Sequence, residues 1–82
     1  MRKTILQSLE QMRANPAADW TLSDLVSVAE AFDCHCSPPR GGGSHFRIGY
    51  NRLVEKLTIP YKRPIKPVYV RHFVAFIDRL RA

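Results

Sequence analysis

One short stretch of the chain combines residue types that could perform acid–base chemistry on a phosphate. Three glycines, Gly41 to Gly43, precede Ser44 and His45. A glycine run lets the backbone approach a ligand closely, and successive N–H groups can form an anion-binding concavity. Arg47 follows two residues after His45, so in a strand both side chains would point to one face. The stretch fits a histidine that acts on bound phosphate, and it also fits a flexible loop before a strand that exposes these two side chains.

A second group of cations, Lys62, Arg63 and Lys66, precedes the last predicted helix. Pro67 suits the first position of that helix, because its missing N–H would have no partner there. Helix N-termini attract anions through free N–H groups and through the helix dipole, and nearby cations would reinforce this effect. The segment is therefore a second candidate anion site, with a solvated basic loop as the alternative.

The net charge of +6 is concentrated in the second half of the chain. Residues 1–36 hold three basic and five acidic side chains, a net charge of −2. Residues 37–82 hold ten basic and two acidic side chains, a net charge of +8. A basic half on so small a domain is typical of a polyanion-binding protein. A charged surface that only maintains solubility is the alternative.

Hydrophobic periodicity predicts three helices around these segments. The first runs from Lys3 to Asn15 and places four apolar residues on one face: Ile5, Leu6, Leu9 and Met12. The second begins at the N-cap Thr21, with Asp24 in the capping-box position. Its predicted buried stripe consists of Leu22, Leu25, Val26, Ala29 and Phe32. The third follows Pro67, and its broad apolar face consists of Tyr69, Val70, Phe73, Val74, Phe76, Ile77 and Leu80.

Three short strands are predicted between the second and third helices, at Cys34–Ser37, Ser44–Tyr50 and Leu53–Pro60. The middle strand alternates cleanly, so His45 and Arg47 should face away from its apolar residues. The order α-α-β-β-β-α predicts an α+β domain. Three antiparallel strands can pack one face on helices and leave the other in solvent.

Without the first helix, the order α-β-β-β-α is that of the double-stranded-RNA-binding fold. We therefore expect a single domain over residues 1–82, with a double-stranded-RNA-binding-domain-like core at 21–82 and a helical extension at 1–20. Element order alone is weak evidence of function, because one fold hosts many activities.

The sequence gives no sign of a membrane segment, a secretion signal or a metal site. No apolar run approaches the roughly 20 residues that span a bilayer, and the N-terminal region lacks the apolar stretch of a signal peptide. We therefore expect a cytoplasmic protein. Cys34, Cys36 and His45 would give zinc three ligands at no familiar spacing. Two reduced, buried thiols, with no metal and no cofactor, are the favoured interpretation.

Three matching segments give the chain a resemblance to a known family. Gly43-Ser44-His45 leads into the alternating strand, Leu57-Thr58-Ile59-Pro60 ends the next strand, and Pro64-Ile65-Lys66-Pro67 leads into a short helix. Over about residues 22–80, this combination resembles the HicA family of toxin ribonucleases. The resemblance implies a double-stranded-RNA-binding-like fold and metal-independent cleavage of mRNA with His45 as the catalytic residue. It also implies neutralisation by a HicB-type antitoxin protein.

The chain departs from the family pattern at Lys62, where many relatives carry a histidine; a lysine there can still bind phosphate. We predict that the contacts with RNA come from Arg40, Gly43, Ser44, Arg47, Lys62, Arg63 and Lys66.

Metal-free RNA cleavage needs a base that removes the 2′-hydroxyl proton, groups that stabilise the phosphorane charge, and an acid for the 5′ oxygen. Histidine suits the base, because its side chain titrates near neutral pH. The sequence does not identify the acid. Two other classes of protein remain open: a non-catalytic RNA-binding module of the same fold, and an interaction domain whose basic half meets an acidic protein.

Overall fold

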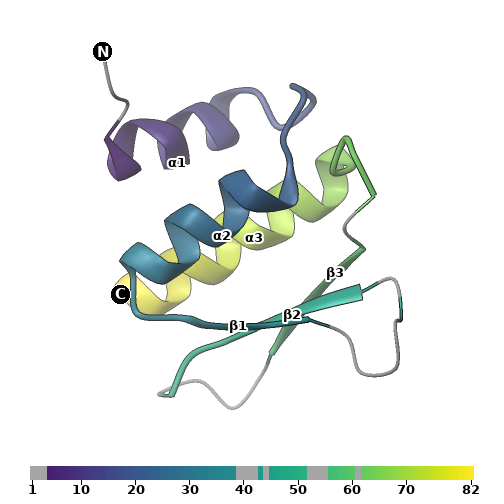
Figure 1. Ribbon diagram of the computed structural model, residues 1–82. Helices are drawn as coiled ribbons and strands as arrows, with labels where there is room; N and C mark the ends of the chain where they lie inside the picture. The colour runs from purple at the N-terminus through teal and green to yellow at the C-terminus, as the bar shows by residue number, and fades with distance from the viewer. Residues whose placement is uncertain (1–3, 39–42, 44, 52–55, 61) are drawn as a thin grey trace.

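Three helices and a three-stranded antiparallel sheet make up the part of the chain that the structure describes, which is a small α+β domain (Figure 1). A computed structural model describes residues 4–38, 43, 45–51, 56–60 and 62–82. The elements are α1 (Ile5–Ala14), α2 (Leu22–Ala31), β1 (His35–Ser37), β2 (His45–Gly49), β3 (Leu57–Pro60) and α3 (Pro67–Arg81). The predicted order α-α-β-β-β-α is confirmed.

Both N-terminal helices begin at capping boxes. In a capping box, the side chain of the N-cap residue accepts from the backbone N–H of the third helical residue, and the side chain of that third residue accepts from the N-cap backbone N–H. At α2, the Asp24 N–H donates to Thr21 Oγ1 at 3.3 Å, and the Thr21 N–H donates to Asp24 Oδ2 at 2.8 Å. This confirms the predicted start of α2. At α1, Thr4 and Gln7 form the equivalent pair, so α1 begins at Ile5 rather than at Lys3 as predicted.

The end of α2 is a Schellman motif. The Cys34 N–H donates to the Ala29 carbonyl at 3.0 Å, and the Asp33 N–H donates to the Glu30 carbonyl at 3.1 Å. Asp33 takes the left-handed conformation that this motif requires, with φ of 64°. The turn directs the chain from α2 into β1.

The sheet has the strand order β1-β2-β3, with β2 in the centre. In the register of β2 with β3, His45 lies opposite Pro60 and Arg47 lies opposite Thr58. Between β1 and β2, His35 lies opposite Gly49. The predicted third strand is shorter at its start: Lys56 precedes it, and residues 53–55 lie outside the described residues.

All three helices lie on the same side of the sheet (Figure 1). Helix α2 packs against β1 and α3 packs against β3, while α1 packs on α2 and α3 on the side away from the sheet. The other side of the sheet carries five exposed side chains: His35, Ser37, His45, Arg47 and Thr58. We call this side the open face. The predicted outward facing of His45 and Arg47 is confirmed.

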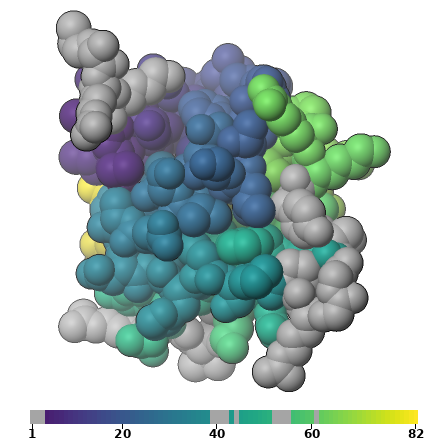
Figure 2. Space-filling view, viewed as in Figure 1, coloured from purple at the N-terminus to yellow at the C-terminus, as the bar shows by residue number. Residues whose placement is uncertain are grey.

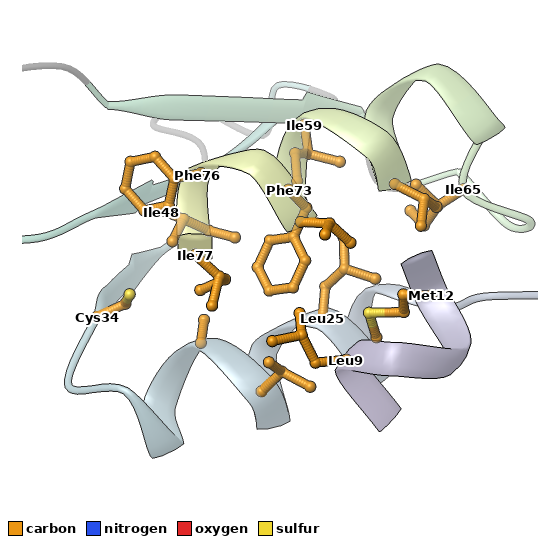
Figure 3. Packing of buried hydrophobic residues seen from close by; sticks show 14 residues of the cluster. Leu9, Met12, Leu25, Cys34, Ile48, Ile59, Ile65, Phe73, Phe76 and Ile77 are labelled. Atoms are coloured by element: carbon orange, nitrogen blue, oxygen red, sulfur yellow. The ribbon is translucent and has the colours of Figure 1, made fainter. Parts of the chain in front are cut away.

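Between the helices and the sheet lies one hydrophobic cluster (Figure 3). Its fully buried members include Leu9, Met12, Leu25, Ile48, Ile59, Phe73, Phe76 and Ile77. The apolar face predicted for α3 is confirmed. The buried stripe predicted for α2 did not include Val28. The structure shows Val28 to be 1% exposed, because it lies one helical turn from Leu25 on the buried side of the helix. The prediction that Leu6 shares the inner face of α1 is wrong: it is 53% exposed, since it lies about 90° around the helix from the midpoint of Leu9 and Met12.

Candidate functional site

His45 is the first residue of β2, and its side chain is exposed on the open face. Its direct neighbour across the sheet is Pro60, the last residue of β3. This pairing brings the segment that follows β3 to the end of the sheet where His45 lies. A short strand in a hydrogen-bonded sheet holds its side chains more firmly than a loop does.

Arg47 lies on the same face, two residues further along β2, which corresponds to about 7 Å. It is flanked by Ser37 in β1 and Thr58 in β3, both exposed. The core side of β2 is held by Ile48, which is 0% exposed. The buried half of the strand therefore fixes the direction in which His45 and Arg47 project.

The predicted basic cluster lines a hollow beside this end of the sheet. We call it the basic hollow; its volume is about 410 Å³, and it is lined by Pro60, Lys62, Arg63, Pro64, Lys66 and Tyr69. Lys62 and Lys66 are exposed. Because Pro60 pairs with His45 and also lines the hollow, the structure brings three predicted RNA-contacting residues to the neighbourhood of the predicted catalytic residue.

Arg63 forms an ion pair that the sequence did not predict. Its Nε donates to Asp19 Oδ1 at 3.2 Å, and its Nη2 donates to Asp19 Oδ2 at 2.8 Å. This hydrogen bonding holds the pKa of the Asp19 carboxyl below its usual value. Of the three cations in the cluster, Arg63 is therefore partly neutralised by a carboxylate from the connection between α1 and α2.

A backbone hydrogen bond reinforces that contact: the Ile65 N–H donates to the Trp20 carbonyl at 2.8 Å. Ile65 itself is 1% exposed and belongs to the hydrophobic cluster. In the space-filling view, the green segment after β3 lies against the blue connection between α1 and α2 (Figure 2). The basic segment is thus held in place by packing and by hydrogen bonds on its inner side.

The glycine-rich loop is described only in part. Gly43 is exposed and precedes β2. Arg40 and Ser44, which were predicted to contact RNA, lie outside the described residues, as do Gly41 and Gly42. The candidate site that the structure does describe therefore consists of His45, Arg47 and the basic hollow.

A second hollow lies on the open face at the other end of β2. We call it the sheet-face hollow; its volume is about 610 Å³, and it is lined by His35, Ser37, Arg47, Gly49, Tyr50, Asn51 and Lys56. The His35 Nε2 and the Asn51 Oδ1 are 2.9 Å apart, within hydrogen-bonding distance. No role was predicted from the sequence for His35, Asn51 or Lys56. The one sequence signal for His35 is its position between Cys34 and Cys36. In a strand, His35 points to the face opposite to the two cysteines, which predicts that it lies on the open face.

Neither cysteine has the properties of a reactive thiol. Both are free; Cys34 is buried and Cys36 is half-buried. Burial raises the pKa of the Cys34 thiol to about 11 and also raises the pKa of Cys36. Since the thiolate is the nucleophile and the metal ligand, both groups stay in the unreactive form at neutral pH.

The described residues offer neither a metal-binding cluster nor a membrane-spanning helix. Among these residues, no group of three or more His, Cys, Asp or Glu side chains is placed to hold a metal ion. Within the same part of the chain, the helices are too short or too polar to cross a membrane.

Comparisons with protein-family models, curated proteins and solved structures find no match to this chain. Any function assigned to the site therefore depends on its own residues and their geometry. Those residues offer an outward-facing histidine flanked by cations on a sheet face, and this combination can bind a phosphodiester and move a proton beside it.

Proposed function

We propose that this protein is a metal-independent endoribonuclease that cleaves single-stranded mRNA, and that it acts as the toxin of a HicA/HicB-type toxin–antitoxin pair. The observation that carries the proposal is the position of His45. It is exposed at the end of a rigid strand, on the same face as Arg47 and directly opposite Pro60, which borders the basic hollow. The likeness of the Gly-Ser-His and Thr-Ile-Pro segments to HicA toxins supports the same function.

In this proposal, His45 accepts the proton of a ribose 2′-hydroxyl, whose oxygen then attacks the adjacent phosphorus. The bond from phosphorus to the 5′ oxygen breaks, and the products are a 2′,3′-cyclic phosphate and a free 5′-hydroxyl. Arg47 and Lys62 stabilise the additional negative charge on the phosphorane. A positioned general base typically contributes 10²–10⁴-fold to such a step. The acid that protonates the 5′ oxygen is not assigned to any residue.

The arrangement of elements supports a double-stranded-RNA-binding-like core. Helices α2 and α3 flank the strands in the order α-β-β-β-α, and both pack on one face of an antiparallel sheet ordered β1-β2-β3. Helix α1 is an addition that packs on the outer side of these helices.

The proposed protein partner is an antitoxin of the HicB type, which covers the open face and prevents access of RNA. The net charge of +8 on residues 37–82 supports this pairing, because an acidic partner would associate faster with such a surface. A size-exclusion titration with the antitoxin should give a complex that no longer cleaves RNA.

The substitution His45→Ala tests the catalytic proposal. It should abolish cleavage of a defined RNA while leaving the fold intact, because an outward-facing side chain contributes little packing and such changes usually stay within about 0.5 kcal/mol. His72→Ala is the matched control, since His72 is exposed on α3. Thermal melting and circular dichroism establish that both variants are folded. The wild-type protein should also cleave in the presence of EDTA.

Three outcomes separate the proposal from its alternatives. If the His45→Ala protein cleaves as fast as wild type, His45 has no catalytic role. If wild-type protein binds RNA and leaves it intact, the protein is a non-catalytic RNA-binding module. Absence of RNA affinity even at low salt would instead favour an interaction domain that binds an acidic protein.

A further inference from the structure

The sheet-face hollow lies on the same face of β2 as His45 but at the opposite end of the strand. His45 and Gly49 are the first and last residues of β2, so about 13 Å separates them along the strand. That is roughly the rise of four stacked nucleotides at about 3.4 Å each. Arg47 lies between the two ends and lines the hollow. One RNA strand could therefore contact His45 and the sheet-face hollow together.

Lys56 reaches the hollow alongside Gly49. A Cβ placed on Gly49 would lie 3.6 Å from the Lys56 Cγ, and 3.9 Å from both its Cδ and its Cε. The methylene chain of Lys56 thus lies along the sheet surface at Gly49. A lysine packed by its stem in this way keeps its ammonium group in solvent, where it can meet a phosphate.

Asn51 supplies hydrogen-bond donors on the other side of the hollow, and His35 orients them. With the proton on His35 Nε2, this nitrogen donates to Asn51 Oδ1 at 2.9 Å. The contact fixes the orientation of the Asn51 amide, because its oxygen is used as the acceptor. The amide nitrogen, which carries two N–H donors, then points away from His35. Oriented N–H donors of this kind suit the oxygen atoms of a phosphate or a ribose.

The described residues that line the hollow include two basic side chains, Arg47 and Lys56, besides His35, and no carboxylate belongs to that set. A polar and cationic surface beside a proposed ribonuclease site matches the backbone of a single-stranded nucleic acid, whose affinity comes largely from phosphate contacts.

We propose that the sheet-face hollow is a second RNA-binding subsite, in which Lys56 and Asn51 hold the phosphate–ribose backbone several nucleotides away from the bond cleaved at His45, and His35 orients the Asn51 amide. Arg47 connects this subsite to His45. The inference rests on the proposed function, because it takes RNA as the ligand, but Lys56, Asn51 and His35 play no part in the proposed cleavage step.

The test is the affinity of variants for an unstructured RNA of about 12 nucleotides at several salt concentrations. The RNA carries 2′-O-methyl groups, which remove the attacking hydroxyl, so binding is measured without cleavage. Lys56→Ala should weaken binding and reduce the slope of log affinity against log salt by about 0.7, the contribution of one phosphate contact on a single strand. Lys56→Arg should retain the wild-type slope. In a nuclear magnetic resonance titration of wild-type protein, the Asn51 side-chain amide should shift on addition of the RNA.

Arg71→Ala is the matched control, because Arg71 is an exposed cation on α3, on the other side of the sheet. It should bind RNA as wild type does. If Lys56→Ala matches Arg71→Ala in affinity and slope, the subsite is refuted even when wild-type protein cleaves RNA. If Lys56→Ala alone is impaired and wild-type protein does not cleave an unmodified RNA, the subsite stands and the ribonuclease proposal fails. Wild-type protein without RNA affinity would overturn both.

Discussion

Two leucines of α1 allow the role of this helix to be measured with a matched pair of substitutions. Leu9 is 0% exposed and lies in the hydrophobic cluster with Leu25 and Phe73, whereas Leu6 is 53% exposed on the same helix. Leu6 lies in the first turn of α1 and Leu9 lies near its middle. Both would be replaced by alanine, whose helix propensity is close to that of leucine, so propensity contributes little to either change. The difference between the two variants therefore reports the burial of one side chain.

The expected magnitude follows from that burial. Replacing a fully buried leucine with alanine removes its transfer free energy and leaves a cavity, at about 2–5 kcal/mol. Leu9→Ala should therefore lower the free energy of unfolding by about 3 kcal/mol. For a domain of this size, each 1 kcal/mol shifts the melting temperature by roughly 4–8 °C, which gives a decrease of about 12–24 °C. Leu6→Ala should stay within about 0.5 kcal/mol of wild type.

Urea unfolding followed by circular dichroism measures both variants, with melting curves as a second readout. A single transition that includes the signal of α1 is expected, because Leu9 and Met12 belong to the same cluster as the residues of α3. Equal stability of the Leu9→Ala and Leu6→Ala proteins would refute the reasoning, since it would mean that α1 does not share the core in solution.

Three further changes test other features of the structure. Asp33→Gly should raise the free energy of unfolding by about 0.5–1 kcal/mol, because glycine adopts the left-handed conformation at φ of 64° without steric cost, and Asp33→Ala should not; urea unfolding compares them. Stability should fall as the pH rises from 9 towards 11, because the Cys34 thiol ionises at its ordinary pKa of 9.0 in the unfolded chain but only at about 11 when folded. Melting curves of Cys34→Ala should show a weaker decline over that pH range, and an unchanged decline would remove Cys34 as its cause. Asp19→Ala should change stability by less than about 1 kcal/mol, since the ion pair is exposed, but should release Arg63 and steepen the salt dependence of RNA affinity by about 0.7; an unchanged slope would mean that Arg63 does not meet RNA.

Sequence periodicity predicted the elements whose signal is local. The broad face of α3, the capping box at Thr21 and the alternation around His45 are each contained within a few neighbouring residues, and the structure has all three. The outward facing of His45 followed from the same alternation. Leu6 was misplaced because spacing shows which residues share a stripe, whereas the width of the stripe depends on how many neighbours a helix touches.

The remaining features of the site depend on pairs that are distant in the sequence. Arg63 and Asp19 are 44 positions apart, and His35 and Asn51 are 16 positions apart. No periodic pattern marks such pairs, because each is created by the packing of elements rather than by the elements themselves. The placement of Lys56 beside Gly49 has the same origin: it depends on the strand register, which a sequence fixes only through turns and facing residues.

These distant pairs also connect the N-terminal helix to the candidate site. The connection between α1 and α2 supplies Asp19 to the Arg63 guanidinium and the Trp20 carbonyl to the Ile65 N–H. At the other end of the basic segment, Pro60 is held by its pairing with His45. The cations of the basic hollow are therefore positioned relative to His45 by contacts on both sides, and a catalytic constellation benefits when its members are held before the substrate binds. The connection that follows α1, though distant from the open face, thus helps to position the residues beside that face.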